Sequence, residues 1–333
     1  MPAMDAVPRE VLQAAYKRNH LYLLKIPMNY GLWAACGFLL NAIKDTPYFI
    51  PVGIACSILI ANLIRGLGSV AHDAVHGVVF KSKVASYWMG LLCWAPSGMA
   101  YTIYSNYHLH HHRITNSYPD VDNFVVTDYT RNPFLAKVLL LVVFTFAYPI
   151  YFAFQMFRYT KRLSTWKKIR MNLELVGWWA IVFVAARLLP FGVFFFLYLL
   201  PFFLGSVLAS TTSMIEHYEM EEGDDAYSSR TYASKMPIAN FIWNNLGYHN
   251  EHHNFPGIPH YNLRKFHEAA LPYYDERIKK NIYPNFFGLV FHLWGRILKV
   301  DVEKIEAKYA HLNRNEETQK HMKLQGISPA NAT

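Results

Sequence analysis

Four long apolar stretches constrain the fold of this chain more than any other feature of its sequence. They cover residues 21–43, 48–66, 173–189 and 191–212. Each is about as long as a helix must be to cross the hydrocarbon core of a bilayer, which takes roughly 17–25 residues. Residues 44–47 form a turn between the first two stretches, and Pro190 separates the last two. We therefore predict an all-α integral membrane protein in which four spans form two transmembrane helical hairpins.

The composition agrees with a membrane protein and argues against a nucleic-acid partner. Only 17% of the 333 residues are charged and 53% are hydrophobic, whereas a soluble domain has about 25% charged residues. A basic cytoplasmic face explains the net charge of +9, because no basic run in a polar domain is interleaved with aromatic residues that could stack on bases. Cys36, Cys56 and Cys93 lie in apolar stretches, which predicts buried thiols rather than a disulfide framework.

A fifth apolar stretch, residues 134–157, is predicted not to cross the membrane. The segment after it, 158–170, contains six basic residues, and the positive-inside rule places such a segment in the cytoplasm. A crossing by 134–157 would put those residues outside and would separate the histidine clusters described below. We therefore expect this stretch to lie in the interface or to re-enter near Pro149, with the active site and both termini on the cytoplasmic side.

The remaining segments complete the predicted architecture. Apolar side chains in the first twenty residues fall at helical spacing, which indicates an interfacial helix. Residues 84–104 are apolar but broken by Pro96, so we predict a helix at the membrane surface. The predicted parts are an N-terminal interfacial helix (1–20), a membrane domain (21–312) whose cytoplasmic cap covers 213–312, and a polar tail (313–333).

Nine histidines in four clusters form the candidate functional site. Two clusters repeat the spacing i, i+3, i+4, which on a helix places three imidazoles on one face. The nine are His72 and His76; His108, His111 and His112; His217; and His249, His252 and His253. Imidazole suits zinc, copper, iron and nickel, and nine ligands are too many for one four-coordinate ion. We therefore predict a site with two metal ions.

A metal transporter is the remote alternative to an enzyme. Transporter ligands lie near the middle of the spans, whereas each cluster here lies at or beyond the end of a predicted span, which favours an enzyme at the cytoplasmic face. The other histidines are expected to be structural or exposed, with His110 pointing away from its neighbours; they are His20, His110, His260, His267, His292, His311 and His321.

Five acidic residues close to the clusters could accept the second N–H of a ligating imidazole. They are Asp73, Asp120, Asp122, Glu216 and Glu251. We favour Glu216 and Glu251 for this role, because each lies inside a cluster. A solvated or capping carboxylate remains the alternative for Asp120 and Asp122.

The histidine boxes resemble those of the membrane fatty acid desaturase and hydroxylase superfamily, the three-histidine-box non-haem diiron enzymes. That family carries HxxxH, HxxHH and HxxHH in this order, and here the boxes occupy residues 72–76, 108–112 and 249–253. The resemblance covers roughly residues 45–275. The segment 215–218, Ile-Glu-His-Tyr, is similar to the extra-ligand segment of membrane alkane hydroxylases and sphingolipid desaturases. The third box is similar in wording to that of acyl-lipid and sphingolipid desaturases.

The resemblance implies two iron ions (Fe2+/Fe3+), O2 as co-substrate, and a lipid or fatty acyl substrate whose chain enters a tunnel between the spans. Zinc can replace iron on heterologous expression. No His-Pro-Gly-Gly haem motif occurs, so electrons are expected from an external donor of the ferredoxin, rubredoxin or cytochrome b5 type. The basic segments 158–170 and 277–280 are candidate docking surfaces for it, and contact with membrane lipids is an equal alternative for 158–170.

Several reactions are implied as possible on such a scaffold. We favour a fatty acid (lipid) desaturase that introduces a C=C bond, on the wording of the third box. The alternatives are a fatty acyl or alkane hydroxylase, favoured by the segment around His217, an alkene-forming fatty acid decarboxylase, and a carotenoid ketolase or hydroxylase. The first box has three intervening residues rather than the four of acyl-CoA desaturases, which argues against the acyl-CoA Δ9 group.

Overall fold

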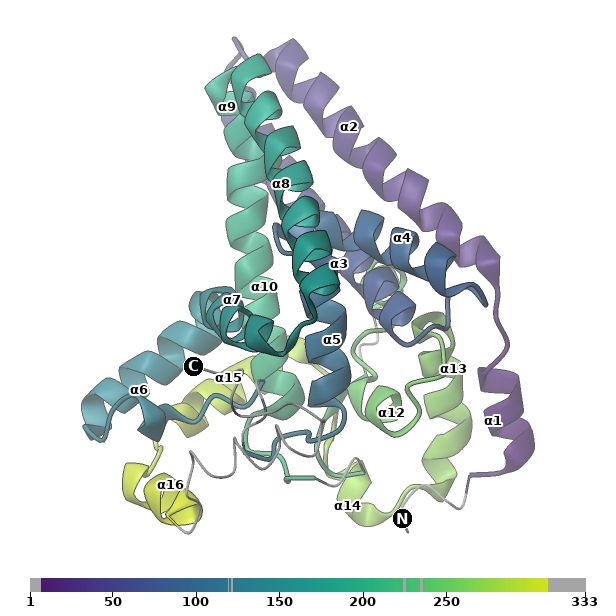
Figure 1. Cartoon of the computed structure of the whole chain (residues 1–333), viewed down its shortest axis with the longest axis vertical. Coiled ribbons are helices and arrows are strands. Elements are labelled where there is room, and N and C mark those ends of the chain that lie inside the picture. Colours follow the sequence, from purple (N-terminus) through teal and green to yellow (C-terminus); the bar gives the residue numbers. More distant parts are fainter. Residues whose placement is uncertain (1–6, 119, 121, 224–225, 234–235, 311–333) are drawn as a thin grey trace.

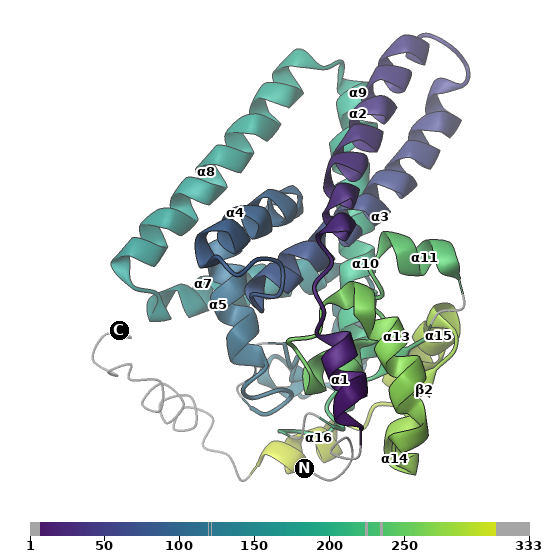
Figure 2. The same ribbon diagram turned by 90° about the vertical axis from the view of Figure 1, so that its right-hand side faces the viewer.

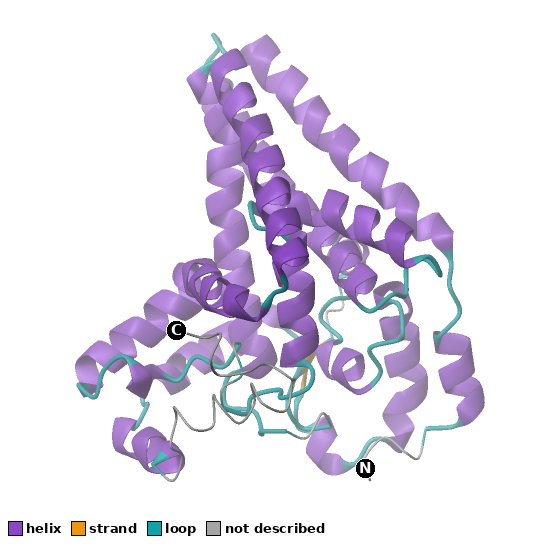
Figure 3. Cartoon of the chain, in the orientation of Figure 1, coloured by secondary structure: helices purple, strands orange, loops and turns teal. Residues whose placement is uncertain are grey.

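Helices make up nearly all of the regular structure (Figure 3). The computed structural model describes residues 7–118, 120, 122–223, 226–233 and 236–310. Its α-helices are α1 (Arg9–Ala15), α2 (Lys25–Ile43), α3 (Phe49–Val75), α4 (Lys83–Trp94), α5 (Tyr101–His111), α6 (Pro133–Val142), α7 (Tyr148–Tyr159), α8 (Thr165–Leu188), α9 (Phe191–Phe194), α10 (Leu200–His217), α11 (Pro237–Ile242), α12 (His249–Asn254), α13 (His260–Ala270), α14 (Glu276–Lys279), α15 (Phe286–Ile297) and α16 (Val302–Tyr309). Two short strands, β1 (Thr231–Tyr232) and β2 (Ile282–Tyr283), pair in parallel with Thr231 opposite Ile282.

Two helical hairpins rise from one side of the molecule (Figure 1). One is α2 and α3; the other is α8 and the rod formed by α9, a π-helical turn and α10. Each of these four helical segments coincides with one of the predicted spans, although α3 continues to Val75 and α8 begins at Thr165. Figure 2 shows that α8 leans away from α10 toward its lower end. The predicted hairpins are therefore present in the fold.

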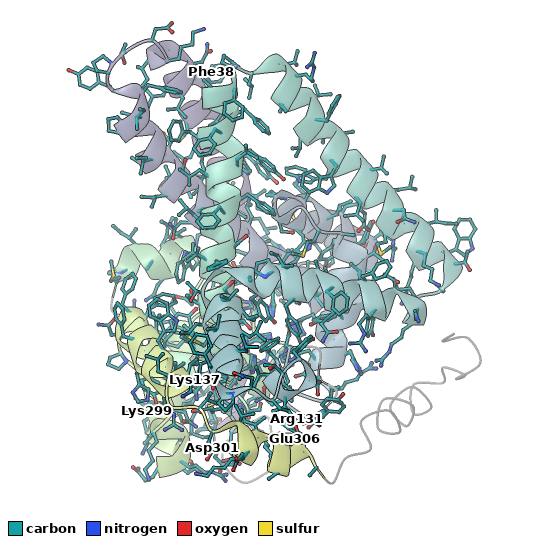
Figure 4. The ribbon with its side chains drawn as sticks, turned by 90° about the vertical axis from the view of Figure 1, so that its left-hand side faces the viewer. Phe38, Arg131, Lys137, Lys299, Asp301 and Glu306 are labelled. Carbon is teal, nitrogen blue, oxygen red and sulfur yellow. The ribbon has the colours of Figure 1, made fainter. Side chains whose placement is uncertain are left out.

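The outer faces of the hairpins are apolar. Phe38 on α2 is 80% exposed, and α8 exposes Leu173, Val176 and Phe183. Figure 4 shows Phe38 near one end of the molecule, far from the labelled charged residues at the other end, where Arg131 pairs with Glu306 at 3.0 Å. A continuous apolar surface of this kind is covered by lipid rather than water in a stable protein.

Five helices are long and apolar enough to cross a membrane: Arg9–Ile43, Phe49–Val75, Pro133–Arg162, Thr165–Leu188 and Phe191–His217. Four of them contain the predicted spans. The fifth contains 134–157 and consists of α6, the π-helical turn Val143–Ala147 and α7. It runs obliquely across the lower part of α10 instead of alongside the hairpins (Figure 1). The number of true crossings therefore stays a prediction.

Proline explains both π-helical turns. Pro149 follows the turn Val143–Ala147, and Pro201 follows the turn Phe195–Leu199. Since proline has no N–H, the carbonyl four residues earlier loses its helical partner. For Pro201 that carbonyl belongs to Leu197, and the indole N–H of Trp33 donates to it at 3.0 Å. The first hairpin thus supplies the hydrogen bond that the second one lacks.

The segment 84–104 differs from the single surface helix that we predicted. It forms two helices, α4 and α5, joined by a 3-10 turn at Ala95–Ser97. Pro96 limits the first helix, and Gly98 has a φ of 75°, a left-handed conformation that favours glycine and redirects the chain. The redirection aims α5, which carries the second histidine box, down toward the cap.

The N-terminal helix packs onto the cap. Ala15 of α1 is buried in one apolar cluster with Leu263 and Phe266 of α13. Residues 1–6 and the predicted polar tail, 313–333, lie outside the described residues. The cap itself therefore rests on α1 on one side and on the ends of the membrane helices on the other.

Candidate metal centre

Four helix ends deliver the nine predicted ligands to one place. His72 lies in the last turn of α3, and His76 caps it. α5 carries His108 and His111 and is capped by His112. His217 is the last residue of α10, and α12 begins with His249. The lower ends of α3, α5 and α10 point into the region where α12 lies (Figure 1), so the site forms where the membrane helices meet the cap.

The imidazoles fall into two sets whose nitrogens lie close enough to share an ion. The first contains His72, His76, His108, His112 and His252. The second contains His111, His217 and His253, and His249 joins it with its Nε2 2.9 Å from that of His217 and 3.1 Å from that of His253. Two ligands at right angles, each about 2.1 Å from one ion, lie about 3.0 Å apart. The observed separations match that geometry.

Hydrogen bonding between the rings does not account for the packing. His108 Nε2 lies 3.1 Å from His76 Nε2 and 3.0 Å from His112 Nε2. Each Nε2 has one in-plane N–H or one lone pair, so it cannot satisfy two such neighbours. Both ring nitrogens of His72 are buried without a hydrogen-bond partner among the described residues. Buried imidazole nitrogens without partners, arranged around two centres, fit a pair of metal ions.

Electrostatics keep most of the cluster neutral. Burial lowers the pKa of His76 to about 3, with repulsion from His260 and His111 adding to it. Burial and neighbouring imidazoles also hold the pKa values of His108, His249 and His252 well below the usual range. A neutral imidazole is the form that binds a metal.

His111 is the exception, because it lies against two carboxylates. Burial by itself would lower its pKa, but the charges of Asp120 and Asp122 and a hydrogen bond to Asp120 raise that pKa to about 9. His111 Nδ1 lies 2.9 Å from Asp120 Oδ2 and 3.3 Å from Asp122 Oδ2. A carboxylate at Nδ1 fixes the ring orientation and turns Nε2 toward the site.

A backbone carbonyl does the same for His217. Its Nδ1 donates to the carbonyl of Ser228 at 3.1 Å, and its Nε2 is the atom close to His249. His110 faces the other way, as its place on α5 predicts, with its Nε2 3.0 Å from Nη1 of Arg162. Thus the structure places His217 with the three boxes and His110 outside them.

The other carboxylates differ from expectation. Glu251 accepts from His267 Nδ1 and Thr231 Oγ1, both at 2.5 Å, rather than from an imidazole of the boxes. Glu216 lies 3.8 Å from His249 Nε2 and pairs with Arg65. In the described part of the chain, Asp120 and Asp122 are therefore the predicted carboxylates that contact the second nitrogen of a candidate ligand.

Asp73 holds a histidine that the sequence did not single out. His260 donates from Nδ1 to Asp73 Oδ1 at 2.6 Å. Its ring lies 4.7 Å from that of His72 and 5.0 Å from that of His252, and its buried Nε2 has no hydrogen-bond partner among the described residues. Pro256 interrupts the helix after the third box, so helical spacing could not connect His260 with the cluster.

A cavity of about 230 Å³ opens from the metal centre between the spans. Both sets of histidines reach it, and its far part is apolar; the apolar lining residues include Ile64, Trp94, Met99, Phe152 and Phe202. A larger cavity of about 880 Å³ lies beside α15 and α16 and touches His217 alone among the nine histidines. The smaller cavity is the one that could hold an alkyl chain against both metal positions.

Comparison with known proteins places these features in a family. A profile described as fatty acid desaturase matches residues 48–282. The chain is 26% identical over 252 residues to the sphingolipid delta(4)-desaturase of Bos taurus, covering 74% of this chain and 72% of that protein. It is 30% identical over 216 residues to the sphingolipid delta(4)-desaturase/C4-monooxygenase of Rattus norvegicus, covering 61% of each.

A bacterial relative is matched over more of its length. The chain is 25% identical over 322 residues to the sn-1 acyl-lipid omega-3 desaturase (ferredoxin) of Synechocystis sp., covering 86% of both. The match spans 63% and 61% of the sphingolipid delta(4)-desaturases of Pongo abelii and Mus musculus. The three boxes all fall inside the matched profile.

Proposed function

The chain belongs to the fatty acid desaturase family, and from this premise we propose that it is a membrane-bound, oxygen-dependent diiron desaturase that introduces a C=C bond into a lipid acyl chain. As a member of this family it is an oxidoreductase. The observation that carries the proposal is the pair of histidine sets at the mouth of an apolar cavity. A desaturase needs both features, a metal pair and a sheath for an unreactive chain.

The residues present fit two ions, and we assign the ligands by set. His72, His76, His108, His112 and His252 would hold one iron, and His111, His217, His249 and His253 the other. When bound, the irons supply activation of O2 for removal of hydrogen from an unactivated C–H bond. The chain itself orients the imidazoles, through Asp120 at His111 and the Ser228 carbonyl at His217.

The cavity contributes by orientation and by excluding water. Its apolar walls would hold an alkyl chain extended between α3 and α10, with the reacting carbons near His72, His108 and His249. Burial of a chain of this kind is favourable at about 0.8 kcal/mol per CH₂ group. Holding the reacting C–H bond against the centre is a positioning effect that requires no further side-chain chemistry.

Product analysis tests the proposal. We expect lipids from cells that express the chain to lose two hydrogens at a fixed position, as measured by mass spectrometry. The purified protein should hold two irons, or two zincs after overexpression. At most one ion per folded chain would refute the dinuclear assignment, and unchanged lipids in cells that supply a reductant would refute the reaction.

Hydroxylation is the second candidate reaction, because one relative is named as both a desaturase and a C4-monooxygenase. The same mass spectra separate the two, since hydroxylation adds one oxygen. The comparisons do not favour the decarboxylase, carotenoid or transporter alternatives.

We propose four spans with both termini cytoplasmic and with α6 and α7 at the interface. The six basic residues in 158–170 and the oblique course of the α6–α7 rod (Figure 1) support this topology. We further propose that residues 21–312 form one domain with a cytoplasmic cap at 213–312, flanked by the interfacial helix 1–20 and the tail 313–333.

Cysteine labelling tests the topology, and the native cysteines help because all three are buried. A membrane-impermeant reagent added outside should label Asp45→Cys in the loop between α2 and α3. It should label Thr165→Cys only after the membrane is permeabilised. Labelling of Thr165→Cys in intact cells would refute the topology.

We also propose that electrons come from a small acidic carrier of the ferredoxin, rubredoxin or cytochrome b5 type. The basic surface available to it is smaller than the sequence indicates. Lys167 donates to Asn106 and Arg170 to Thr102, and Arg277 pairs with Glu221. Arg158 and Lys168 remain exposed, and they are the residues at which loss of charge should slow reduction most.

A further inference from the structure

An ion pair lies inside the cavity, close to the metal centre. Arg65 of α3 and Glu216 of α10 both line the cavity, and Nη2 of the one lies 3.5 Å from Oε1 of the other. That distance is too long for a charge-assisted hydrogen bond, which is usually 2.7–2.9 Å. The side chains are only 21% and 10% exposed, so water does little to satisfy them.

The pair has unused hydrogen-bonding atoms. Nε and Nη2 of Arg65 and Oε1 of Glu216 are buried without a hydrogen-bond partner among the described residues. The hydroxyl of Tyr232, close enough to feel both charges, is in the same condition. A purely structural ion pair in a low-dielectric environment is expected to close up and saturate its donors and acceptors. This pair is instead open toward a cavity.

The surrounding residues leave room for a ligand at the pair. Along α3 the cavity is lined by Ala61, Arg65, Gly68 and His72, which share one face of the helix. A side chain at Gly68 would meet nothing within 4 Å. A group bound at Arg65 would therefore lie on the same helix face as His72, about 10 Å along the axis at 1.5 Å per residue, with the guanidinium reaching toward Glu216 beside His217.

Charge balance selects the chemistry of that group. The positive charge of Arg65 is already balanced by Glu216, and Asp122 adds a further negative charge at the cavity wall. A carboxylate or phosphate would be placed against these carboxylates. A neutral group that accepts from the guanidinium and donates to the carboxylate satisfies both sides.

We propose that Arg65 and Glu216 bind a hydroxyl or amide group of the lipid substrate, close to the carbons that react. This proposal rests on the proposed desaturase function and narrows its substrate class. The substrate would be a lipid that carries its hydroxyl or amide group near the reacting carbons. A chain whose only polar group is a distant ester or carboxylate would leave the pair unsatisfied.

Direct binding tests the proposal without turnover. The probes are N-octanoyl sphinganine, palmitic acid and hexadecane, added to the purified, metal-loaded full chain in detergent. The wild type should bind N-octanoyl sphinganine at least tenfold more tightly than either of the others. Arg65→Met should lose that preference, while its affinity for hexadecane and its metal content stay unchanged. Arg187→Met on α8, which removes an exposed arginine outside the cavity, is the matched control and should behave as the wild type.

Three outcomes would overturn the proposal: tighter binding of palmitic acid, equal binding of all probes by the wild type, or a preserved preference in Arg65→Met. If Arg65→Met does not fold because Glu216 is left unpaired, the double variant Arg65→Met/Glu216→Gln removes both charges and should show the same loss of preference. Product analysis of the wild type separates the two levels. Desaturated lipid from a wild type without the preference would refute this inference alone, and its absence together with an iron-free protein would refute the proposed function.

Discussion

Asp120→Asn should weaken one metal position and spare the other. The carboxylate of Asp120 holds His111 in the second set, with Oδ2 2.9 Å from Nδ1 of that ring. Its oxygens also accept two backbone N–H groups, from Asn116 to Oδ2 at 2.7 Å and from Asp122 to Oδ1 at 3.1 Å. Whichever oxygen becomes an NH₂ group in the variant, it faces one of these donors.

The expected loss has two parts. Removing a carboxylate that orients a ligating histidine typically costs 10–100-fold in metal affinity, which is about 1.4–2.7 kcal/mol at a factor of ten per 1.4 kcal/mol. Losing one hydrogen bond to a charged group should cost a further 1.5–3 kcal/mol or so of folding stability. Both losses are small enough for the variant to fold and insert.

Chelator titration of the purified, metal-loaded protein measures the effect, with metal per chain determined by mass spectrometry. The variant should lose one ion at a chelator concentration 10–100-fold below that needed for the wild type, and it should keep the second. Asp45→Asn, in the exposed turn between α2 and α3, is the control for loss of one carboxylate. Wild-type retention of both ions would refute the role given to Asp120, and simultaneous loss of both would mean that the two sets are not independent.

Three further outcomes follow from the geometry. His217→Ala should fold and insert, yield no product and hold less iron; near-normal activity with full metal occupancy would leave a site of eight histidines. Removing the metal from the wild type should lower its melting temperature, because ring nitrogens such as those of His72 lose their partner; an unchanged transition in a verified metal-free sample would contradict the fit argued above. Trp33→Phe should lower stability by about 1–3 kcal/mol, because the Leu197 carbonyl loses its donor, whereas Trp166→Phe, at a residue 80% exposed, should change it little; equal melting temperatures in detergent would show that the bond at Leu197 is dispensable.

Hydropathy predicted the hairpins well, because length and apolarity are what a span requires. It could not predict direction for 134–157, since an apolar helix that packs across α10 has the same composition as one that crosses a membrane. Nor could it predict how the second hairpin replaces the hydrogen bond lost at Pro201. That replacement depends on Trp33, a residue more than 160 positions away in the chain.

The spacing of the boxes predicted which histidines would gather but not how they would divide. On a helix, His111 lies about 60° to one side of His108 and His112 about 40° to the other, at 100° per residue. His108 and His112 accordingly join the first set and His111 the second. One box therefore serves both metal positions.

The same geometry explains why the favoured carboxylates were the wrong ones to expect beside an imidazole. Glu251 lies two residues after His249, about 200° around α12, so its carboxylate must point away from the cluster and meets His267. Asp73 follows His72 by about 100° and meets His260 on α13. An acceptor for a ligating ring has to come from another part of the chain, as Asp120 does by returning from the loop after α5 to contact His111. Proximity in the sequence thus argues against the role that proximity in space provides, and the partners of buried imidazoles are best sought in the loops that follow a box rather than between its histidines.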